Sequence, residues 1–287
     1  MACLFVEQLT VLDFSRLDRA RGLVGESWIV DLELEGELDA QSMVLDFGEV
    51  KRVARQAVED CADHKLLVPA GGSAQVGHAA GSTQVTFPWG GGRRLRVRSP
   101  ADALGMVPAA EVDMSALEPM LVAAVRAVVP ANVRRIRVGL REEDRPGHYY
   151  HYSHGLKRHA GHCQRIAHGH RSRIEIWADG VRDDALEREW ARRWRDVYLG
   201  SAEDLQAERS TAGGTILEFA YEAPQGRFEL AIDRDRCEVI PSDSTVECLA
   251  AYVAAALARR QPGTAFRVRA YEGVNKGAVA EFGPVRT

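Results

Sequence analysis

The residues best suited to chemistry are histidines gathered in one segment. Seven of the nine histidines fall between His148 and His170. Because alternate residues of a strand project from one face, His168 and His170, on either side of Gly169, can direct both imidazoles at one metal ion. His154 ends a preceding aromatic run and would lie on the antiparallel neighbouring strand. Three imidazoles with an open fourth position are typical of a catalytic zinc site.

A nearby thiol supports this interpretation. Cys163 stands five residues before His168, and a metal cation close to it would favour the thiolate, which is a usable base or nucleophile. His159 and His162 are alternative ligands in the same segment. The competing interpretation is a solvated histidine-rich loop, since a His-x-His spacing also occurs by chance.

Length and composition narrow the class of protein. The 287 residues, 46% of them hydrophobic, predict two domains or one large one with buried cores. A formal net charge of -4 gives no indication of nucleic-acid binding. We expect neither a membrane span nor export, because no apolar stretch is long enough to cross a bilayer and Glu7 interrupts the first apolar run, and five scattered cysteines suit free thiols. We therefore expect a cytoplasmic protein without membrane or nucleic-acid partners.

The order of predicted elements repeats when the chain is divided after residue 145. In the first half the pattern predicts strands over 4–14 and 27–35, a helix over 47–58, a hairpin over 84–98, a helix over 115–129 and a strand over 133–140. In the second half it predicts strands over 149–154 and 172–178, a helix over 185–197, a hairpin over 216–232, a helix over 246–258 and a strand over 265–271. We expect each half to read strand–strand–helix–hairpin–helix–strand–strand. This plan predicts an α+β fold of antiparallel sheets with helices on one face. Small sheets of this kind need neighbours to cover them, so we expect a homo-oligomer.

Several motifs at these positions resemble one enzyme family. Asp46-Phe47-Gly48 precedes the first helix, Asp63-His64 follows it, and Thr245 and Glu247 begin the last helix. With the three histidines and Cys163, these motifs make the chain similar to the 6-pyruvoyltetrahydropterin synthase and 6-carboxytetrahydropterin synthase family, zinc enzymes of the tunnelling fold (T-fold). The resemblance covers nearly the whole chain and implies two T-fold units in tandem, each with an extra hairpin.

The resemblance assigns roles to individual residues. It implies Zn²⁺ on His154, His168 and His170, Cys163 as catalytic base, and Asp63 and His64 as a proton relay. It also implies that Glu272 anchors the amino-pyrimidinone edge of a pterin and that Thr245 faces the ring, although Thr245 could equally be only a helix cap. Five basic residues surround the metal strand, where they could bind a triphosphate or only favour solubility, and they are Lys157, Arg158, Arg165, Arg171 and Arg173.

Each half departs from the family pattern in a complementary way. In the first half, Val24-Gly25-Glu26 stands where His-Gly-His is expected, and Asp18 lies near the position of the first zinc histidine. In the second half, the segment beginning at Tyr198 stands where an Asp-His pair is expected. We therefore predict that unit 1–145 lacks the zinc ligands but carries the Asp-His motif, and that unit 146–287 carries the zinc histidines, the cysteine and the glutamate. The active site would then be split between the two units.

The resemblance implies a zinc-dependent lyase acting on 7,8-dihydroneopterin triphosphate. We expect 6-carboxytetrahydropterin synthase activity, which feeds 7-deazapurine (queuosine) biosynthesis. The alternatives are 6-pyruvoyltetrahydropterin synthase activity on the same substrate, or an inactive homologue that binds pterin or metal. The sequence leaves open whether the split site forms within one chain or between chains.

Overall fold

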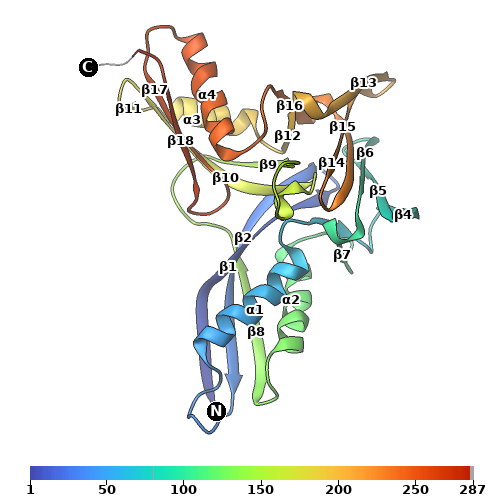
Figure 1. Ribbon diagram of the computed structural model, residues 1–287, viewed down its shortest axis with the longest axis vertical. Coiled ribbons are helices and arrows are strands. Elements are labelled where there is room, and N and C mark those ends of the chain that lie inside the picture. Colours follow the sequence, from blue (N-terminus) through green and yellow to red (C-terminus); the bar gives the residue numbers. More distant parts are fainter. Residues whose placement is uncertain (80, 285–287) are drawn as a thin grey trace.

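The computed structural model describes residues 1–79 and 81–284, and it has the predicted α+β fold (Figure 1). The first half forms a five-stranded sheet in the order β7-β3-β1-β2-β8. Helices α1 and α2 pack through one apolar core onto the long hairpin β1–β2 and the adjoining β8. The bounds are β1 Ala2–Asp18, β2 Gly22–Gly36, α1 Phe47–Ala62, β3 Leu66–Pro69, β7 Leu104–Val107, α2 Met114–Val128 and β8 Val133–Arg141.

The second half is built on a closely related plan. Its principal sheet has the order β16-β12-β9-β10-β17-β18, with the short β11 paired to β10, and α3 and α4 supply the core beside it. The bounds are β9 Tyr149–His154, β10 His168–Ala178, β11 Val181–Arg182, α3 Asp184–Arg193, β12 Val197–Ser201, β16 Cys237–Ile240, α4 Val246–Arg260, β17 Phe266–Tyr271 and β18 Gly277–Phe282.

The extra strands of both halves join in a third sheet, which has the order β13-β14-β15-β6-β5-β4. The two halves meet where β15 pairs antiparallel with β6, with Leu230 opposite Val97. A third core beneath this sheet draws apolar residues from both halves, including Leu17, Phe87 and Phe219. The bounds are β4 Gln75–Ala79, β5 Ser82–Trp89, β6 Arg93–Ser99, β13 Leu205–Thr211, β14 Gly214–Ala223 and β15 Gly226–Asp233.

Local sequence explains where the helices begin. The side chains of Asp46, Asp113, Asp183 and Thr245 each accept a hydrogen bond from a backbone N–H of the helix that follows. Within α1 the buried residues recur every fourth position, from Val50 to Ala62, so one face turns to the sheet.

The principal sheets of the two halves touch at two glycines. A Cβ on Gly25 of β2 would lie 1.9 Å from the Tyr152 carbonyl oxygen, and one on Gly169 of β10 would lie 2.6 Å from the Gly25 Cα. Beside this contact the hydroxyls of Ser15 and Ser153 are 2.7 Å apart and hydrogen bonded. The strands therefore approach more closely than any side chain would allow.

Some predicted details are wrong. The two principal sheets are mixed rather than purely antiparallel, because β3 runs parallel to both β1 and β7, and β12 runs parallel to both β9 and β16. The first half has a single strand, β8, after its second helix, where two strands were predicted. Helix α3 was predicted to reach residue 197 but ends at Arg193, because residues 197–201 form β12. Across residues 1–79 and 81–284, none of the helices has the length and apolarity required to cross a membrane.

Candidate active site

Three histidines converge where β9 and β10 pair. His154 lies opposite His168 in the register of the two strands, and His170 is two residues further along the same face of β10. Each offers a ring nitrogen within 4.8 Å of the other two, and all three side chains are buried. The alternative ligands His159 and His162 are exposed and lie outside this group.

The second nitrogen of two of these rings is fixed by hydrogen bonds. Nδ1 of His154 and Nδ1 of His168 lie 3.0 and 2.8 Å from the carbonyl oxygens of Ser244 and Arg165, which can only accept, so both Nδ1 atoms carry the proton. The Nε2 lone pairs therefore point inward. Nε2 of His154 is 3.2 Å from Nε2 of His170, and the buried Nε2 of His168 has no partner among the described residues.

This donor set fits a divalent metal ion. Burial, together with the neighbouring imidazoles, lowers the pKa of His154 and His168 well below the usual range, so both rings are neutral and able to donate a lone pair. Buried nitrogens without a partner are costly, and a cation among them would satisfy them. Neutral imidazoles with their other nitrogen hydrogen bonded are the usual ligands of zinc.

Asp13 of β1 adds a carboxylate that sequence reasoning missed. Its Oδ1 lies 3.2 Å from Nδ1 of His170 and accepts from the Ser27 hydroxyl, while its Oδ2 lies 3.0 Å from Nζ of Lys276. Burial alone would raise the pKa of Asp13, but His170, Lys276 and Ser27 hold it well below its usual range. A charged residue among the apolar residues of β1 was the available signal.

The Asp-His pair lies against this group in the same chain. Asp63 caps the end of α1, and its Oδ2 is 2.6 Å from Nδ1 of His64. The His64 backbone has a φ of 53°, which turns the ring toward His168, and the two rings stack with centroids 5.1 Å apart. The Asp63 Oδ1 accepts from the backbone N–H of Asp13, so the pair is tied to β1.

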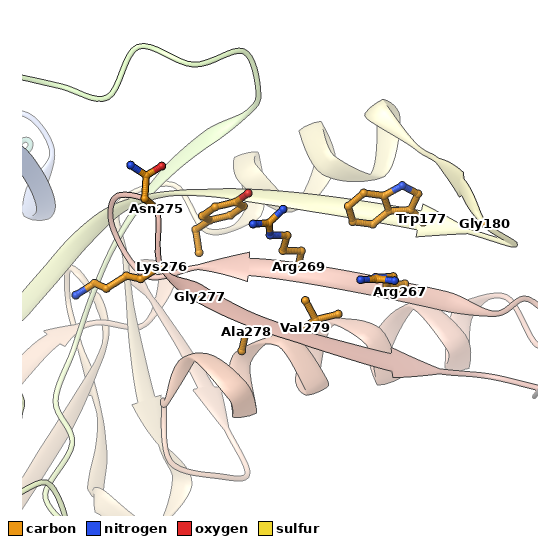
Figure 2. A pocket seen from close by; sticks show the side chains of 10 residues that line it. Trp177, Gly180, Arg267, Arg269, Asn275, Lys276, Gly277, Ala278 and Val279 are labelled. Atoms are coloured by element: carbon orange, nitrogen blue, oxygen red, sulfur yellow. The ribbon is translucent and has the colours of Figure 1, made fainter.

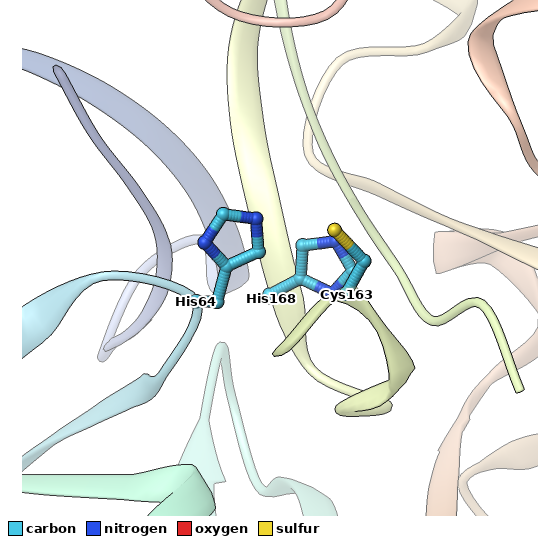
Figure 3. Close-up of side chains that lie close together, drawn as sticks. All are labelled: His64, Cys163 and His168. Carbon is cyan, nitrogen blue, oxygen red and sulfur yellow. The ribbon is translucent and has the colours of Figure 1, made fainter. Parts of the chain in front are cut away.

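Cys163 completes a second cluster with His64 and His168. The sulfur and one nitrogen of each ring lie within 4.8 Å of one another (Figure 3). Burial would lower the pKa of His64, but hydrogen bonds with Asp63 and Cys163 outweigh it and raise that pKa to about 10. A proton can therefore be held between an imidazole and a thiol beside the three histidines.

The segment between β9 and β10 that carries Cys163, called the cysteine loop, is supported by the third sheet. The Leu156 N–H donates to the Cys163 carbonyl, and the Tyr221 hydroxyl of β14 donates to the carbonyl of the buried Gln164. The Gln164 side chain accepts from the N–H of Gln225 in the β14–β15 turn. The hairpin β14–β15, for which the sequence indicated no role, thus holds the loop that carries Cys163.

The two predicted substrate-binding residues differ in their contacts. The Glu272 Oε1, just after β17, is 4.0 Å from Nε2 of His170. Thr245 is the cap of α4, with its hydroxyl accepting from the Cys248 N–H at 3.4 Å, so the capping role is present. Its neighbour Ser244, which the sequence did not single out, is the residue that contacts His154.

Four of the five basic residues near the metal strand are already paired with acids. The pairs join Lys157 to Asp204, Arg158 to Asp243, Arg171 to Glu142 and Arg173 to Glu143. Arg165 differs, because it is buried and its guanidinium contacts only the Gln225 side chain and the His64 carbonyl among the described residues. It is therefore the basic residue of this set that is best able to bind an anion.

A cavity of about 460 Å³ opens beside the Asp-His pair, and Asp13, Glu59, Asp63, His64 and Lys276 are among the residues that line it. A larger cavity of about 800 Å³ follows β17 and β18 (Figure 2). Figure 2 shows Trp177 and Arg267 toward one end of that cavity and Lys276 at the other. The smaller cavity is the candidate substrate site, because Asp63 and His64 line it and do not line the larger one.

The first half has an ion pair where the second half has its histidines. Ser15 pairs with Gly25 in β1–β2 as Ser153 pairs with Gly169 in β9–β10, so Arg16, Val24 and Glu26 occupy the positions of His154, His168 and His170. Nε of Arg16 lies 2.9 Å from Oε1 of Glu26. The counterpart of His154 is thus Arg16 and not Asp18, two residues further along β1.

The counterpart of the Asp-His pair is also displaced from its predicted position. Leu66 pairs with Ser15 as Tyr198 pairs with Ser153, which aligns His64 with Asp196 and Asp63 with Arg195. His64 and Asp196 share a positive φ, of 53° and 56°. The pair is therefore replaced by Arg195-Asp196, ahead of the segment beginning at Tyr198.

Comparison with known proteins supports the family resemblance. Residues 11–81 match the sequence profile of the family described as 6-pyruvoyl tetrahydropterin synthase. Among solved structures, the 6-pyruvoyl tetrahydropterin synthase of Plasmodium vivax is 15% identical, with a TM-score of 0.37, and the match covers 49% of this chain and 97% of that one. The Plasmodium falciparum enzyme is 12% identical with a TM-score of 0.36 and the same coverage. No protein of curated function matches the chain.

Proposed function

We propose, from the match of residues 11–81 to the profile of the 6-pyruvoyl tetrahydropterin synthase family, that the protein is a zinc-dependent lyase acting on 7,8-dihydroneopterin triphosphate. The proposed product is that of a 6-carboxytetrahydropterin synthase, a precursor for 7-deazapurine synthesis in the cytoplasm. One observation carries the proposal, namely that three inward-facing imidazoles, a thiol and an Asp-His pair meet in one place, with the Asp-His pair lining a cavity.

The metal-binding residues of the proposal are His154, His168 and His170. When bound there, zinc would polarise the side-chain hydroxyls of the substrate. The chain itself prepares the ligands, since Ser244 and the Arg165 carbonyl fix two of the rings and Asp13 lies against the third. These contacts keep the three Nε2 atoms directed inward before any ligand arrives.

Proton movement in this proposal belongs to Cys163 and His64. The thiolate of Cys163 removes a proton from a side-chain carbon of the substrate, and His64 exchanges that proton with the substrate oxygen or with solvent. Asp63 fixes the orientation of the His64 ring through the contact of 2.6 Å. Because the three residues come from different elements, the reaction requires the fold to be intact.

Substrate orientation is assigned to residues beside the three histidines. Glu272 accepts two hydrogen bonds from the amino-pyrimidinone edge of the pterin, and Thr245 is a further candidate at the start of α4. Arg165, which is free of carboxylate partners among the described residues, is the candidate for binding the triphosphate.

The proposed active site is complete within one chain. Unit 1–145 contributes Asp63 and His64, and unit 146–287 contributes the three histidines, Cys163 and Glu272. We further propose that the chain forms homo-oligomers, because β8 and β18 lie at the edges of their sheets with their outer backbone groups available for pairing.

The test is to incubate the zinc-loaded protein with 7,8-dihydroneopterin triphosphate and identify the products by mass spectrometry. We expect the carboxy product and about one zinc per chain, and both should be lost in His168→Ala. His162→Ala, which removes an exposed histidine of the same loop, is the matched control and should keep both. A pyruvoyl product would assign the alternative lyase activity, and unchanged substrate with bound zinc would favour an inactive metal-binding homologue.

A further inference from the structure

A second cavity lies where the repeat places the counterpart of the candidate active site. It has a volume of about 490 Å³, close to the 460 Å³ of the active-site cavity. Its lining comes from the start of β9 and from α3, which correspond to β1 and α1 around the active site. This volume is within the range of small-molecule sites.

The lining of this cavity differs in charge from that of the active-site cavity, where three acids stand beside basic residues. The strand registers align Asp13 with His151 and Asp63 with Arg195, and the same offset aligns Glu59 with Ala191. The three acids that line the active-site cavity are therefore replaced by a histidine, an arginine and an alanine in the second cavity. No acidic residue is among the described residues that line the second cavity, and its basic residues are Arg21, His148, His151, Arg188, Arg192 and Arg195.

Two of the four arginines keep an unneutralised charge. Arg21 forms a two-pronged ion pair with the buried Asp196, and Arg188 pairs with Asp184. Arg192 has no acidic partner within residues 1–79 and 81–284, and the only acid near Arg195 is Asp196 at 4.0 Å, already held by Arg21. Both side chains are exposed at the rim, where they can close on a ligand.

Two histidines extend this basic surface at the opposite wall. His148 is held by the Asp184 carboxylate at 2.7 Å, and Nδ1 of His151 donates to the Gly25 carbonyl at 2.8 Å. The Arg16–Glu26 ion pair, which stands in place of the metal ligands, closes the inner end near His151. The three histidines and the Asp-His pair of the candidate active site therefore have no counterparts at these aligned positions, and the surface is suited to binding without turnover.

We propose that this cavity is a binding site for a small phosphate-bearing anion, with Arg192 and Arg195 as its principal ligands. Guanidinium groups bind phosphate oxygens in pairs through parallel N–H donors, and arginine is the side chain that best matches that geometry. The site is separate from the active site and does not depend on the proposed lyase activity.

The test measures binding of inorganic tripolyphosphate to the full-length protein by calorimetry at low ionic strength. The double variant Arg192→Glu/Arg195→Glu should bind at least about tenfold more weakly than the native protein. The double variant Arg134→Glu/Arg259→Glu makes the same change of net charge at exposed arginines elsewhere and should bind normally. Arg192→Ala/Arg195→Ala repeats the test without introducing acids, and circular dichroism verifies folding.

Binding at the active site is distinguished by a further variant. Lys276→Ala removes one of the basic residues that line the active-site cavity and should leave tripolyphosphate binding unchanged. The proposal is overturned if the native protein does not bind tripolyphosphate, if the two arginine variants bind as well as the native protein, or if only Lys276→Ala weakens binding. None of these outcomes bears on whether the protein turns over a pterin.

Discussion

At the scale of residues, the candidate metal site depends on contacts outside the three histidines. The Ser244 carbonyl precedes α4, the Arg165 carbonyl belongs to the cysteine loop, and Asp13 comes from β1 in the other half. Partners of this kind fix the tautomer and direction of a ligand and are worth one to two orders of magnitude in metal affinity or activity. The same reasoning applies to Asp63, which holds His64.

Asp63→Asn should lower kcat by about 10- to 100-fold while zinc content stays near that of the native protein. The amide keeps the size of the side chain but removes the charge that orients and polarises His64, and His64 is not among the proposed ligands. Steady-state kinetics and metal analysis on the same preparation give both quantities.

Asp60→Asn is the control, since this exposed acid of α1 contacts only Gln56 among the described residues. It should leave kcat unchanged. Equal losses in the two variants would show that charge near α1, rather than the Asp63–His64 contact, governs the rate.

At the scale of elements, the hairpin β14–β15 connects stability to chemistry. It pairs with β6 of the first half on one side, and through Tyr221 and Gln225 it holds the loop that carries Cys163 on the other. Gly155 allows this contact, because a Cβ there would lie 2.0 Å from the Tyr221 hydroxyl. The hairpin therefore contributes to the active site without lining it.

Tyr221→Phe should cost about 0.5–1.5 kcal/mol of unfolding free energy and also reduce kcat, because the lost hydrogen bond is one that orders the cysteine loop. Tyr252→Phe is the matched comparison. The hydroxyl of Tyr252, on α4, donates to Glu238 of β16 at 2.6 Å, away from the cysteine loop. Denaturant unfolding should give similar losses for both variants, and only Tyr221→Phe should slow turnover. Equal kcat values for the two variants would contradict the proposed link between the hairpin β14–β15 and Cys163.

At the scale of the whole molecule, the two halves form one structure through the glycine contact of β2 with β10 and the pairing of β6 with β15. The first contact brings Asp13 and His64 to the histidines, and the second covers sheet edges that each half would otherwise expose. The active-site groups are held in place by the packing of one half on the other.

Gly25→Ala should destabilise the protein by about 1–3 kcal/mol or more, since its methyl group would overlap the Tyr152 carbonyl and press on the N–H of His170. Zinc affinity should fall with it. Gly77→Ala in β4, where a Cβ meets no atom within 4 Å, should leave unfolding and zinc content nearly unchanged. Thermal unfolding and metal analysis compare the two, and a native-like Gly25→Ala would contradict the close approach.

Mixing His64→Ala with His168→Ala under conditions of subunit exchange should not restore activity. Both residues of a working site come from the same chain, with their rings stacked at 5.1 Å, so neither variant can supply a complete set. Exchange is verified by mass spectrometry of differently labelled chains. Partial recovery of activity would place the site between chains instead.

Sequence reasoning succeeded where local rules apply. Strand alternation and antiparallel pairing brought His154, His168 and His170 together, and turn and cap residues gave the helices and both hairpins close to their observed bounds. It failed where partners are distant in the chain. The pairing of β15 with β6 and the approach of Asp13 to His170 depend on how the two halves pack, which no local pattern encodes.

The hydrogen bond between the hydroxyls of Ser15 and Ser153 lies at the point where corresponding residues of the two halves meet. One hydroxyl must donate and the other accept, so even this most similar pair of residues cannot be equivalent at any instant. In an assembly of identical subunits, a mutation at such a contact changes the residue on both sides of it. Covalent fusion lets each side change alone, which is the condition under which one ancestral pocket could keep its catalytic groups while its twin took on positive charge.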